Sequence, residues 1–144
     1  MEPRISIITL GVRNFSSSFR FYRDGLGFRT KANESDGIAW FETTSGVLLG
    51  LYPMDKLAED IGADVTVPVA GGFSGITLAH NVLRKEDVAT VLTFAAKAGG
   101  TIVKPAQDVF WGGHAGYFTD PDGYHWEVAW NPGATWDAAG NLTI

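Results

Sequence analysis

Residues 117–130 read YFTDPDGYHWEVAW, and this stretch decides the fold. It begins with a short apolar run, turns at residues 120–123 (Asp-Pro-Asp-Gly) and ends in an alternating run rich in aromatic residues. Proline at the second turn position presets φ, the first aspartate can bond back to the backbone, and glycine closes the corner. Because the flanking residues are β-branched or aromatic, the stretch is predicted to be a β-hairpin.

The second strand of this hairpin carries two polar side chains on one face. Alternation along a strand places His125 and Glu127 on one side and Trp126, Val128 and Trp130 on the other. The large apolar rings need a helix or a core to pack against. We therefore expect the face with His125 and Glu127 to look toward water or a cavity.

Composition excludes several classes of protein. A chain of 144 residues with 45% hydrophobic content suits one globular domain. The absence of cysteine excludes disulfides, thiolate metal sites and a cysteine nucleophile. A net charge of −5 with 11 Lys plus Arg and no basic cluster argues against nucleic acid. No apolar run approaches a membrane span and no secretory signal pattern opens the chain, so we expect a soluble, cytoplasmic protein.

The pattern of the first half recurs in the second. Ile8-Thr9-Leu10 is matched by Ile76-Thr77-Leu78, and each predicted helix ends in glycines before a further strand. Strands are expected at 4–12, 28–32, 38–43 and 47–52, then at 74–81, 101–106, 114–119 and 124–130; helices are expected at 14–24 and 84–98, with a short one within 53–61.

This order predicts an α+β fold built from two βαβββ modules. Module one covers about 4–53, a linker about 54–73, module two about 74–131, and a C-terminal tail without regular structure 132–144. Each module is too small to bury its sheet alone. We therefore expect the two modules to pack together as a curved mixed sheet around a cleft, either within one chain or by exchange between two chains.

Two segments carry a resemblance to a known family. Residues 19–28 read FRFYRDGLGF and residues 118–127 read FTDPDGYHWE. Together with the paired modules, they resemble the vicinal oxygen chelate superfamily, which contains glyoxalase I, extradiol dioxygenases and bleomycin resistance proteins. The resemblance covers roughly residues 4 to 131. It is fairly specific for the fold and much less specific for an activity.

The resemblance implies where a metal would bind. Enzymes of this superfamily hold a divalent metal with side chains from the first and last strand of each module. The internal repeat assigns these four positions to Ile7, Gly50, Gly75 and Glu127, of which only Glu127 can bind a cation. A catalytic zinc usually has three protein ligands, and hard divalent ions take about six ligands. We therefore predict no metal and no other cofactor; the alternative is a divalent metal at Glu127 with His125.

Six residues are the candidates for lining the cleft. Trp111 follows Phe110 and precedes two glycines, which suits a loop that covers a ligand, although a ring tucked over the core remains an alternative. Glu127 either meets a polar group of a ligand, acts as a base, or bonds to a neighbouring strand. The predicted ligand-binding residues are Trp40, Trp111, His114, Tyr117, His125 and Glu127, and the candidate catalytic residues are Glu127 and His125.

Three functions follow from this reading. The leading one is metal-independent binding of a small, partly apolar molecule in an aromatic-lined cleft. The second is a glyoxalase-like lyase or dioxygenase, with an atypical metal site or with metal-free acid/base chemistry at Glu127 and His125. The third is an interaction module whose cleft is filled by its own side chains. The resemblance also implies a homodimer, and the sequence does not name the ligand.

Overall fold

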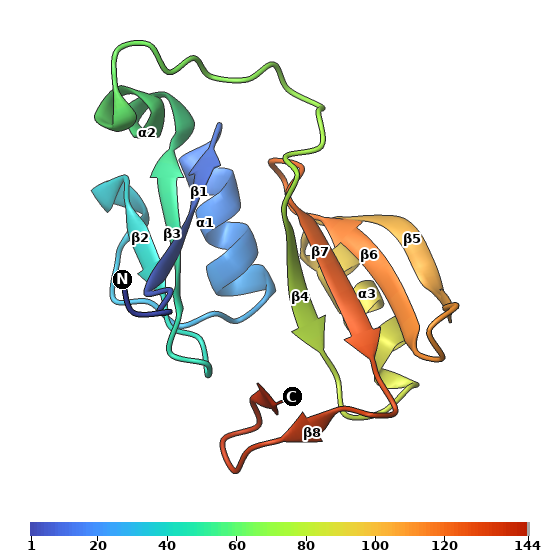
Figure 1. Ribbon diagram of the computed structural model, residues 1–144. Coiled ribbons are helices and arrows are strands. Elements are labelled where there is room, and N and C mark those ends of the chain that lie inside the picture. Colours follow the sequence, from blue (N-terminus) through green and yellow to red (C-terminus); the bar gives the residue numbers. More distant parts are fainter. Residues whose placement is uncertain (144) are drawn as a thin grey trace. The chain divides into compact units, whose positions relative to one another are not determined.

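The computed structural model describes residues 1–143, and its chain contacts divide it into two compact units, Met1–Gly72 and Phe73 onward. Each unit combines a mixed sheet with helices (Figure 1). The predicted α+β class is thereby confirmed. The sheet shared by both modules stays a prediction.

The first unit contains a three-stranded sheet in the order β1-β3-β2. β1 (Ile7–Val12) runs parallel to β3 (Leu48–Pro53), and β2 (Ala39–Phe41) runs antiparallel to it. The helical elements are α1 (Phe15–Arg20), the π-helical turn η1 (Phe21–Gly25), the 3₁₀ turn η2 (Glu34–Asp36) and α2 (Met54–Ile61).

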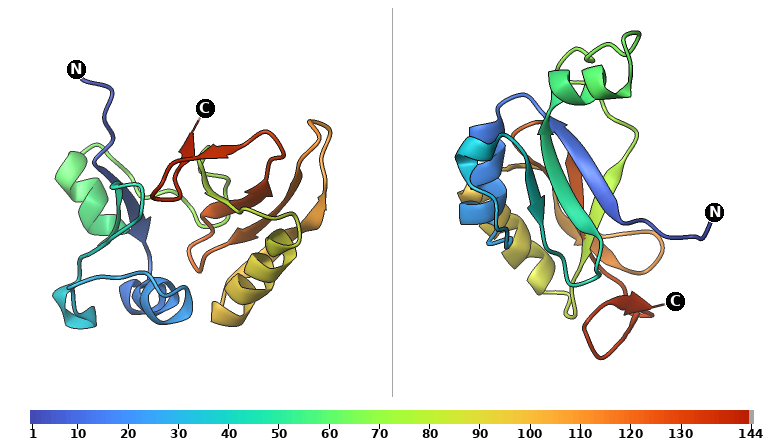
Figure 2. Two further views of the ribbon diagram at one scale, coloured as in Figure 1. Left: turned by 90° about the horizontal axis from the view of Figure 1, so that it is seen from below. Right: turned by 90° about the vertical axis from the view of Figure 1, so that its left-hand side faces the viewer.

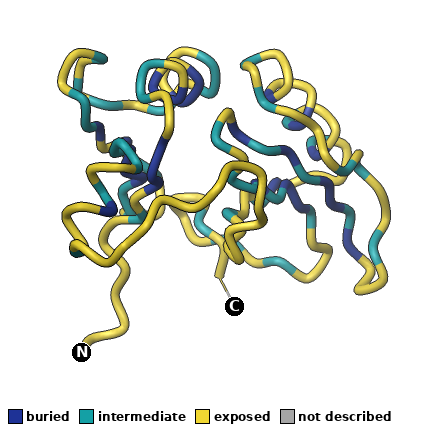
Figure 3. The backbone as a smooth tube through the Cα atoms, turned by 90° about the horizontal axis from the view of Figure 1, so that it is seen from above, coloured by how far each residue is buried: buried dark blue, intermediate teal, exposed yellow. Residues whose placement is uncertain are grey.

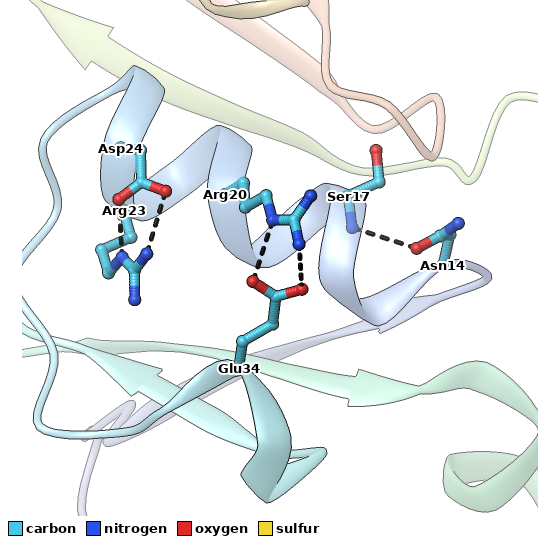
Figure 4. Close-up of polar contacts among 6 residues, drawn as sticks. All are labelled: Asn14, Ser17, Arg20, Arg23, Asp24 and Glu34. Carbon is cyan, nitrogen blue, oxygen red and sulfur yellow. Dashed lines mark hydrogen bonds and ion pairs between the residues drawn. The ribbon is translucent and has the colours of Figure 1, made fainter.

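The predicted helix at 14–24 forms, but in two parts. The Asn14 side chain caps its start by accepting a hydrogen bond from the Ser17 N–H at 3.0 Å (Figure 4). From Phe21 the helix widens into η1, where the Leu26 N–H bonds to the carbonyl five residues earlier. Arg20 donates two hydrogen bonds, of 2.8 and 2.7 Å, to Glu34, which tie α1 to η2 (Figure 4).

The expected strand at 28–32 is wrong. Only Arg29 forms a bridge, with Glu42. The Phe28 N–H instead bonds to the Tyr22 carbonyl, and the Phe28 ring meets the rings of Tyr22 and Phe41 edge-on, with centroids 5.9 and 6.3 Å away. The segment is therefore held by packing in an aromatic core rather than by pairing with a neighbouring strand.

The second unit contains a four-stranded sheet in the order β4-β7-β6-β5. β4 (Thr77–Asn81) runs parallel to β7 (His125–Trp130), and β6 (His114–Thr119) pairs antiparallel with both β7 and β5 (Thr101–Asp108). The predicted hairpin is confirmed as β6 and β7. Its turn is held by the Asp120 carboxylate, which accepts from the N–H groups of Asp122 and Tyr124, and Gly123 takes a left-handed φ of 91°.

One face of this sheet is covered by α3 (Asp87–Ala98), as Figure 2 shows. On that face Phe118 and Trp126 are buried and stack with ring centroids 6.0 Å apart. A Cβ at Gly116 would lie 2.5 Å from Leu92 Cδ1 of the helix, so the sheet and α3 are in close contact. The alternating residues, Tyr117 and Glu127 among them, belong to the opposite, open face.

The tail was expected to lack regular structure, and this is wrong. β8 (Thr135–Trp136) and β9 (Leu142–Thr143) form a small antiparallel hairpin. Its turn copies the 120–123 turn: Asp137 accepts from the N–H groups of Ala139 and Asn141, as Asp120 does from residues two and four positions later.

Residues 63–77, which join the two units, are exposed throughout (Figure 3). Their side chains therefore bury little surface. None of the helices within residues 1–143 has the length and apolarity that crossing a membrane requires.

Candidate functional site

A row of three side chains crosses the open face of the second sheet. Lys104 of β5 is the strand partner of Tyr117 on β6, and Tyr117 is the partner of Glu127 on β7. Directly paired residues on neighbouring strands present their side chains on the same face. The row therefore places a cation, a phenol and a carboxylate side by side.

Tyr117 and Glu127 are joined by a hydrogen bond. The Tyr117 hydroxyl donates to Glu127 Oε1 at 2.8 Å. Desolvation by burial, followed by the hydrogen bond to this carboxylate, raises the pKa of Tyr117 to about 12. The phenol thus stays protonated and fixes one carboxylate oxygen. Within residues 1–143 the Glu127 carboxylate accepts no other hydrogen bond, so Oε2 remains able to accept one from a ligand.

Lys104 reaches this row because β5 is irregular. The register between β5 and β6 shifts twice, between Ile102 and Lys104 and again between Lys104 and Gln107. Each shift inserts an extra residue, as a β-bulge does. Lys104 and Gln107 are three residues apart, yet they pair with Tyr117 and Ala115, which share the open face. The Lys104 ammonium lies 5.7 Å from the centre of the Tyr117 ring.

The loop between β5 and β6 closes one side of this row. The Gly112 N–H bonds to the Val109 carbonyl, and the Val109 N–H to the Gly113 carbonyl, so the loop folds back tightly. Gly113 is buried, and a Cβ there would lie 1.8 Å from Trp111 Cζ3. The Trp111 ring is thus seated against the backbone of Gly113.

Together these elements enclose a pocket of about 280 Å³ in the second unit. Its walls combine aromatic rings with a few polar groups, the composition typical of small-molecule sites. The lining residues are Lys104, Gln107, Asp108, Val109, Phe110, Trp111, Ala115, Tyr117 and Glu127.

Three of the six predicted ligand-binding residues, Trp111, Tyr117 and Glu127, line this pocket. His125 lies two residues from Glu127 on the same strand but outside the lining. Its Nδ1 is buried and has no hydrogen-bond partner within residues 1–143, and its ring meets the Phe73 ring edge-on at 5.4 Å. The structure thus places His125 beside Phe73 rather than against the pocket.

His114 belongs to a different group of charges. Its partner on β7 is Trp130, which lies on the α3 side of the sheet. His114 Nδ1 is 2.6 Å from Asp108 Oδ1, and Lys85 pairs with the same carboxylate oxygen at 2.6 Å. Hydrogen bonds from Lys85 and then His114 lower the pKa of Asp108. The Asp108 charge in the pocket wall is therefore already compensated.

Trp40 belongs to the first unit. It lies on β2, pairs with Gly50 on β3 and is about half exposed. It takes no part in the pocket of the second unit.

The sheet register also tests the four positions at which the superfamily's metal would be held. Gly50 pairs with Thr9, and Glu127 pairs with Ala79. Ile7 lies two residues before Thr9, and Thr77 lies two residues before Ala79, so Thr77 rather than Gly75 is the equivalent of Ile7. Gly75 precedes β4 and takes a left-handed φ of 80°.

The corrected positions still do not supply a metal site. A Cβ on Gly50 would meet Thr9 Oγ1 at 3.1 Å and Ile7 Cγ2 at 3.4 Å, so apolar and hydroxyl groups surround it. Among residues 1–143, no three His, Asp or Glu side chains gather as a group able to hold a metal ion. Glu127 with His125 gives two donors at most. The residues present do not fit the divalent metal that the superfamily's enzymes use.

Sequence reasoning missed Ala115 of β6 and the residues that β5 and the following loop contribute, namely Lys104, Gln107, Asp108, Val109 and Phe110. Phe110 was noted only as a neighbour of Trp111. The sequence of β5 does not indicate that Lys104 and Gln107 share a face, because strict alternation along 101–106 does not reveal two register shifts.

Comparison with known proteins agrees with this architecture. Residues 4–128 match the family described as the Glyoxalase/Bleomycin resistance protein/Dioxygenase superfamily, and the chain belongs to that superfamily. A search of curated proteins finds no match.

Among solved structures, a glyoxalase-related enzyme from Fulvimarina pelagi is 34% identical, with a TM-score of 0.85, over 99% of this chain and 98% of the other. A glyoxalase/bleomycin resistance protein/dioxygenase from Nocardioides is 23% identical, with a TM-score of 0.75, over 90% of this chain and 84% of the other. A lactoylglutathione lyase from Agrobacterium tumefaciens is 17% identical, with a TM-score of 0.66, over 91% of this chain and 96% of the other. The last two similarities concern the fold alone.

Proposed function

We propose that this protein binds a small, partly apolar molecule without a metal, in the pocket of the second unit. The observation that carries the proposal is the composition of that pocket. Rings of Trp111 and Tyr117 supply apolar area, while Lys104 and Glu127 supply polar groups at its wall. Concave sites that combine aromatic walls with a few polar groups are the usual form of small-molecule sites.

The metal-independent part of the proposal rests on the donor set. Of the positions that correspond to the superfamily's ligands, Glu127 alone carries a charged donor. Its Oε1 already accepts the hydrogen bond from Tyr117. The carboxylate is therefore positioned to meet a polar group of a ligand.

The experiment uses 4-methylbenzyl alcohol as a neutral aromatic probe. Binding is followed by two-dimensional NMR of ¹⁵N-labelled protein and by the melting temperature. We expect shifts at residues 104–117 and at Glu127, and a loss of affinity of about tenfold or more in Trp111→Ala, since a buried aromatic contact contributes about 1.5–3 kcal/mol. Trp136→Ala is the matched control, because Trp136 lies in the tail hairpin outside the pocket lining. Shifts elsewhere, or equal affinity of Trp111→Ala and wild type, would contradict the proposal.

A second candidate is a glyoxalase-like lyase or dioxygenase in which Glu127 and His125 perform acid/base chemistry or hold an atypical metal. The observation in its favour is the similarity to the Fulvimarina pelagi protein, which is described as a glyoxalase-related enzyme. Turnover with a bell-shaped pH profile that disappears in Glu127→Gln would favour this candidate over simple binding.

We further propose that the protein is a cytoplasmic homodimer. Support comes from the resemblance to the binding and resistance members of the superfamily. Sedimentation equilibrium of the full chain measures the oligomeric state, and a mass of one chain, 15.5 kDa, would contradict the dimer.

A further inference from the structure

The pocket carries two opposite charges that do not neutralise each other. Lys104 lies on β5 and Glu127 on β7, with Tyr117 of β6 between them. Two strand spacings amount to roughly 10 Å. Neither side chain forms an ion pair with any group in the described part of the chain.

The other charged group in the wall is already compensated. Asp108 pairs with Lys85 at 2.6 Å and with His114 at 2.6 Å. The charges left for a ligand are therefore the Lys104 ammonium at one end of the row and the Glu127 carboxylate at the other.

Between these two charges lies an aromatic surface. The Tyr117 ring stands in the row, with the Lys104 ammonium 5.7 Å from its centre, and Trp111 forms the adjacent wall. A flat apolar body fits between rings of this kind. The Tyr117 hydroxyl donates its proton to Glu127 Oε1, which leaves Oε2 to accept a hydrogen bond from a ligand.

We propose that the pocket selects a zwitterionic aromatic molecule, with an anionic group at Lys104, a protonated amine at Glu127 and a planar ring between them. This inference rests on the proposed binding function and specifies its ligand class. A ligand with only one charge would leave the other protein charge without a partner at the pocket wall.

The test compares four probes of nearly equal shape: 4-methylbenzyl alcohol (neutral), 4-methylbenzoate (anion), 4-methylbenzylamine (cation) and 4-(aminomethyl)benzoate (zwitterion). Dissociation constants are measured by NMR titration at pH 7 and low salt. We expect the zwitterion to bind about two- to fivefold more tightly than either singly charged probe, as expected for charge pairs near a surface. Added salt should reduce this preference, because it screens both contacts.

Two variants assign the charges separately. Lys104→Met keeps the aliphatic stem, and it should make the zwitterion and 4-methylbenzylamine bind equally well. Glu127→Gln keeps an acceptor for the Tyr117 hydroxyl, and it should make the zwitterion and 4-methylbenzoate bind equally well. Glu86→Gln, which removes an exposed carboxylate outside the pocket lining, is the matched control and should leave the order of the four affinities unchanged.

The outcomes separate the two proposals. If none of the four probes binds to the pocket, both the binding function and the zwitterion preference are overturned. If the neutral probe binds and the zwitterion binds no more tightly than the charged ones, the binding function stands and the zwitterion preference is overturned. A zwitterion preference that persists in both Lys104→Met and Glu127→Gln overturns the assignment of the two charges.

Discussion

The Trp111 ring rests on the backbone of Gly113, where a Cβ would come within 1.8 Å of its Cζ3 atom. No backbone strain requires glycine here, since Gly113 is not among the glycines with positive φ. Glycine is needed at this position because the ring occupies the space of a side chain. The orientation of a pocket wall therefore depends on a residue that has no side chain of its own.

The first prediction concerns this pair. Gly113→Ala should displace the Trp111 ring and weaken binding of 4-methylbenzyl alcohol as much as Trp111→Ala does. The fold should survive, because an exposed side chain rather than backbone has to move. NMR titration of both single variants and of the double variant measures the coupling, and the double variant should show no additional loss.

Gly133→Ala is the control for this prediction. A Cβ at Gly133 would first meet Asn131 Oδ1, at an ordinary distance of 3.5 Å. Additive losses in the double variant would show that Gly113 and Trp111 act independently.

The second prediction concerns the ionisation of Tyr117. Its folded-state pKa of about 12 lies above the ordinary value of 10.0, so folding favours the neutral phenol. The stabilising contribution is complete below pH 10 and is lost as the pH rises from 10 to 12. Denaturant unfolding at pH 9 and pH 11 should show a larger loss of stability in wild type than in Tyr117→Phe.

The absorbance change at 295 nm identifies the late-ionising tyrosine among the four in the chain. In Glu127→Gln its pKa should fall but stay above 10, because burial, the largest single cause of the shift, remains when the carboxylate is removed. A pKa of 10 in that variant would assign the whole shift to Glu127.

The third prediction concerns metal content. Protein exposed to Zn, Ni, Fe, Mn and Mg and then passed through gel filtration should retain far less than one equivalent of any of them, as measured by elemental mass spectrometry. The reason is that Glu127 and His125 provide two side-chain donors at most, below the three of a typical catalytic zinc site. One retained equivalent that disappears in Glu127→Ala would instead direct attention to the lyase and dioxygenase candidate.

The fourth prediction compares two turns with the same hydrogen bonds. Asp120→Ala should destabilise the fold by about 1–3 kcal/mol, since it leaves the N–H groups of Asp122 and Tyr124 unpaired in a part-buried turn. Asp137→Ala removes the corresponding bonds to Ala139 and Asn141 in an exposed turn, where water can replace them. Urea unfolding of both variants measures the difference, and equal losses would show that burial does not determine the effect.

The sequence predicted those parts of the fold whose causes are local. The cap at Asn14, the turn closing at Gly123 and the division of β7 into two faces each depend on residues a few positions apart. The tail turn was also accessible in principle, because Asp137 and Gly140 repeat the spacing of Asp120 and Gly123.

Other features depend on contacts that the sequence pattern does not reveal. Phe28 packs in the aromatic core although its segment resembles a strand in sequence. Lys104 reaches the pocket only through the register shifts in β5. For the site, Trp111, Tyr117 and Glu127 were found because aromatic residues and a carboxylate stand out in the sequence. His114 was placed with them from its position beside two glycines, which does not specify the face of the strand.

The irregular path of β5 bears on how such proteins diverge. Without the register shift between Ile102 and Lys104, Lys104 would pair with Gly116 and its side chain would turn toward α3. A change in the length of β5 can therefore alter the charged lining of this pocket without any substitution at Tyr117 or Glu127.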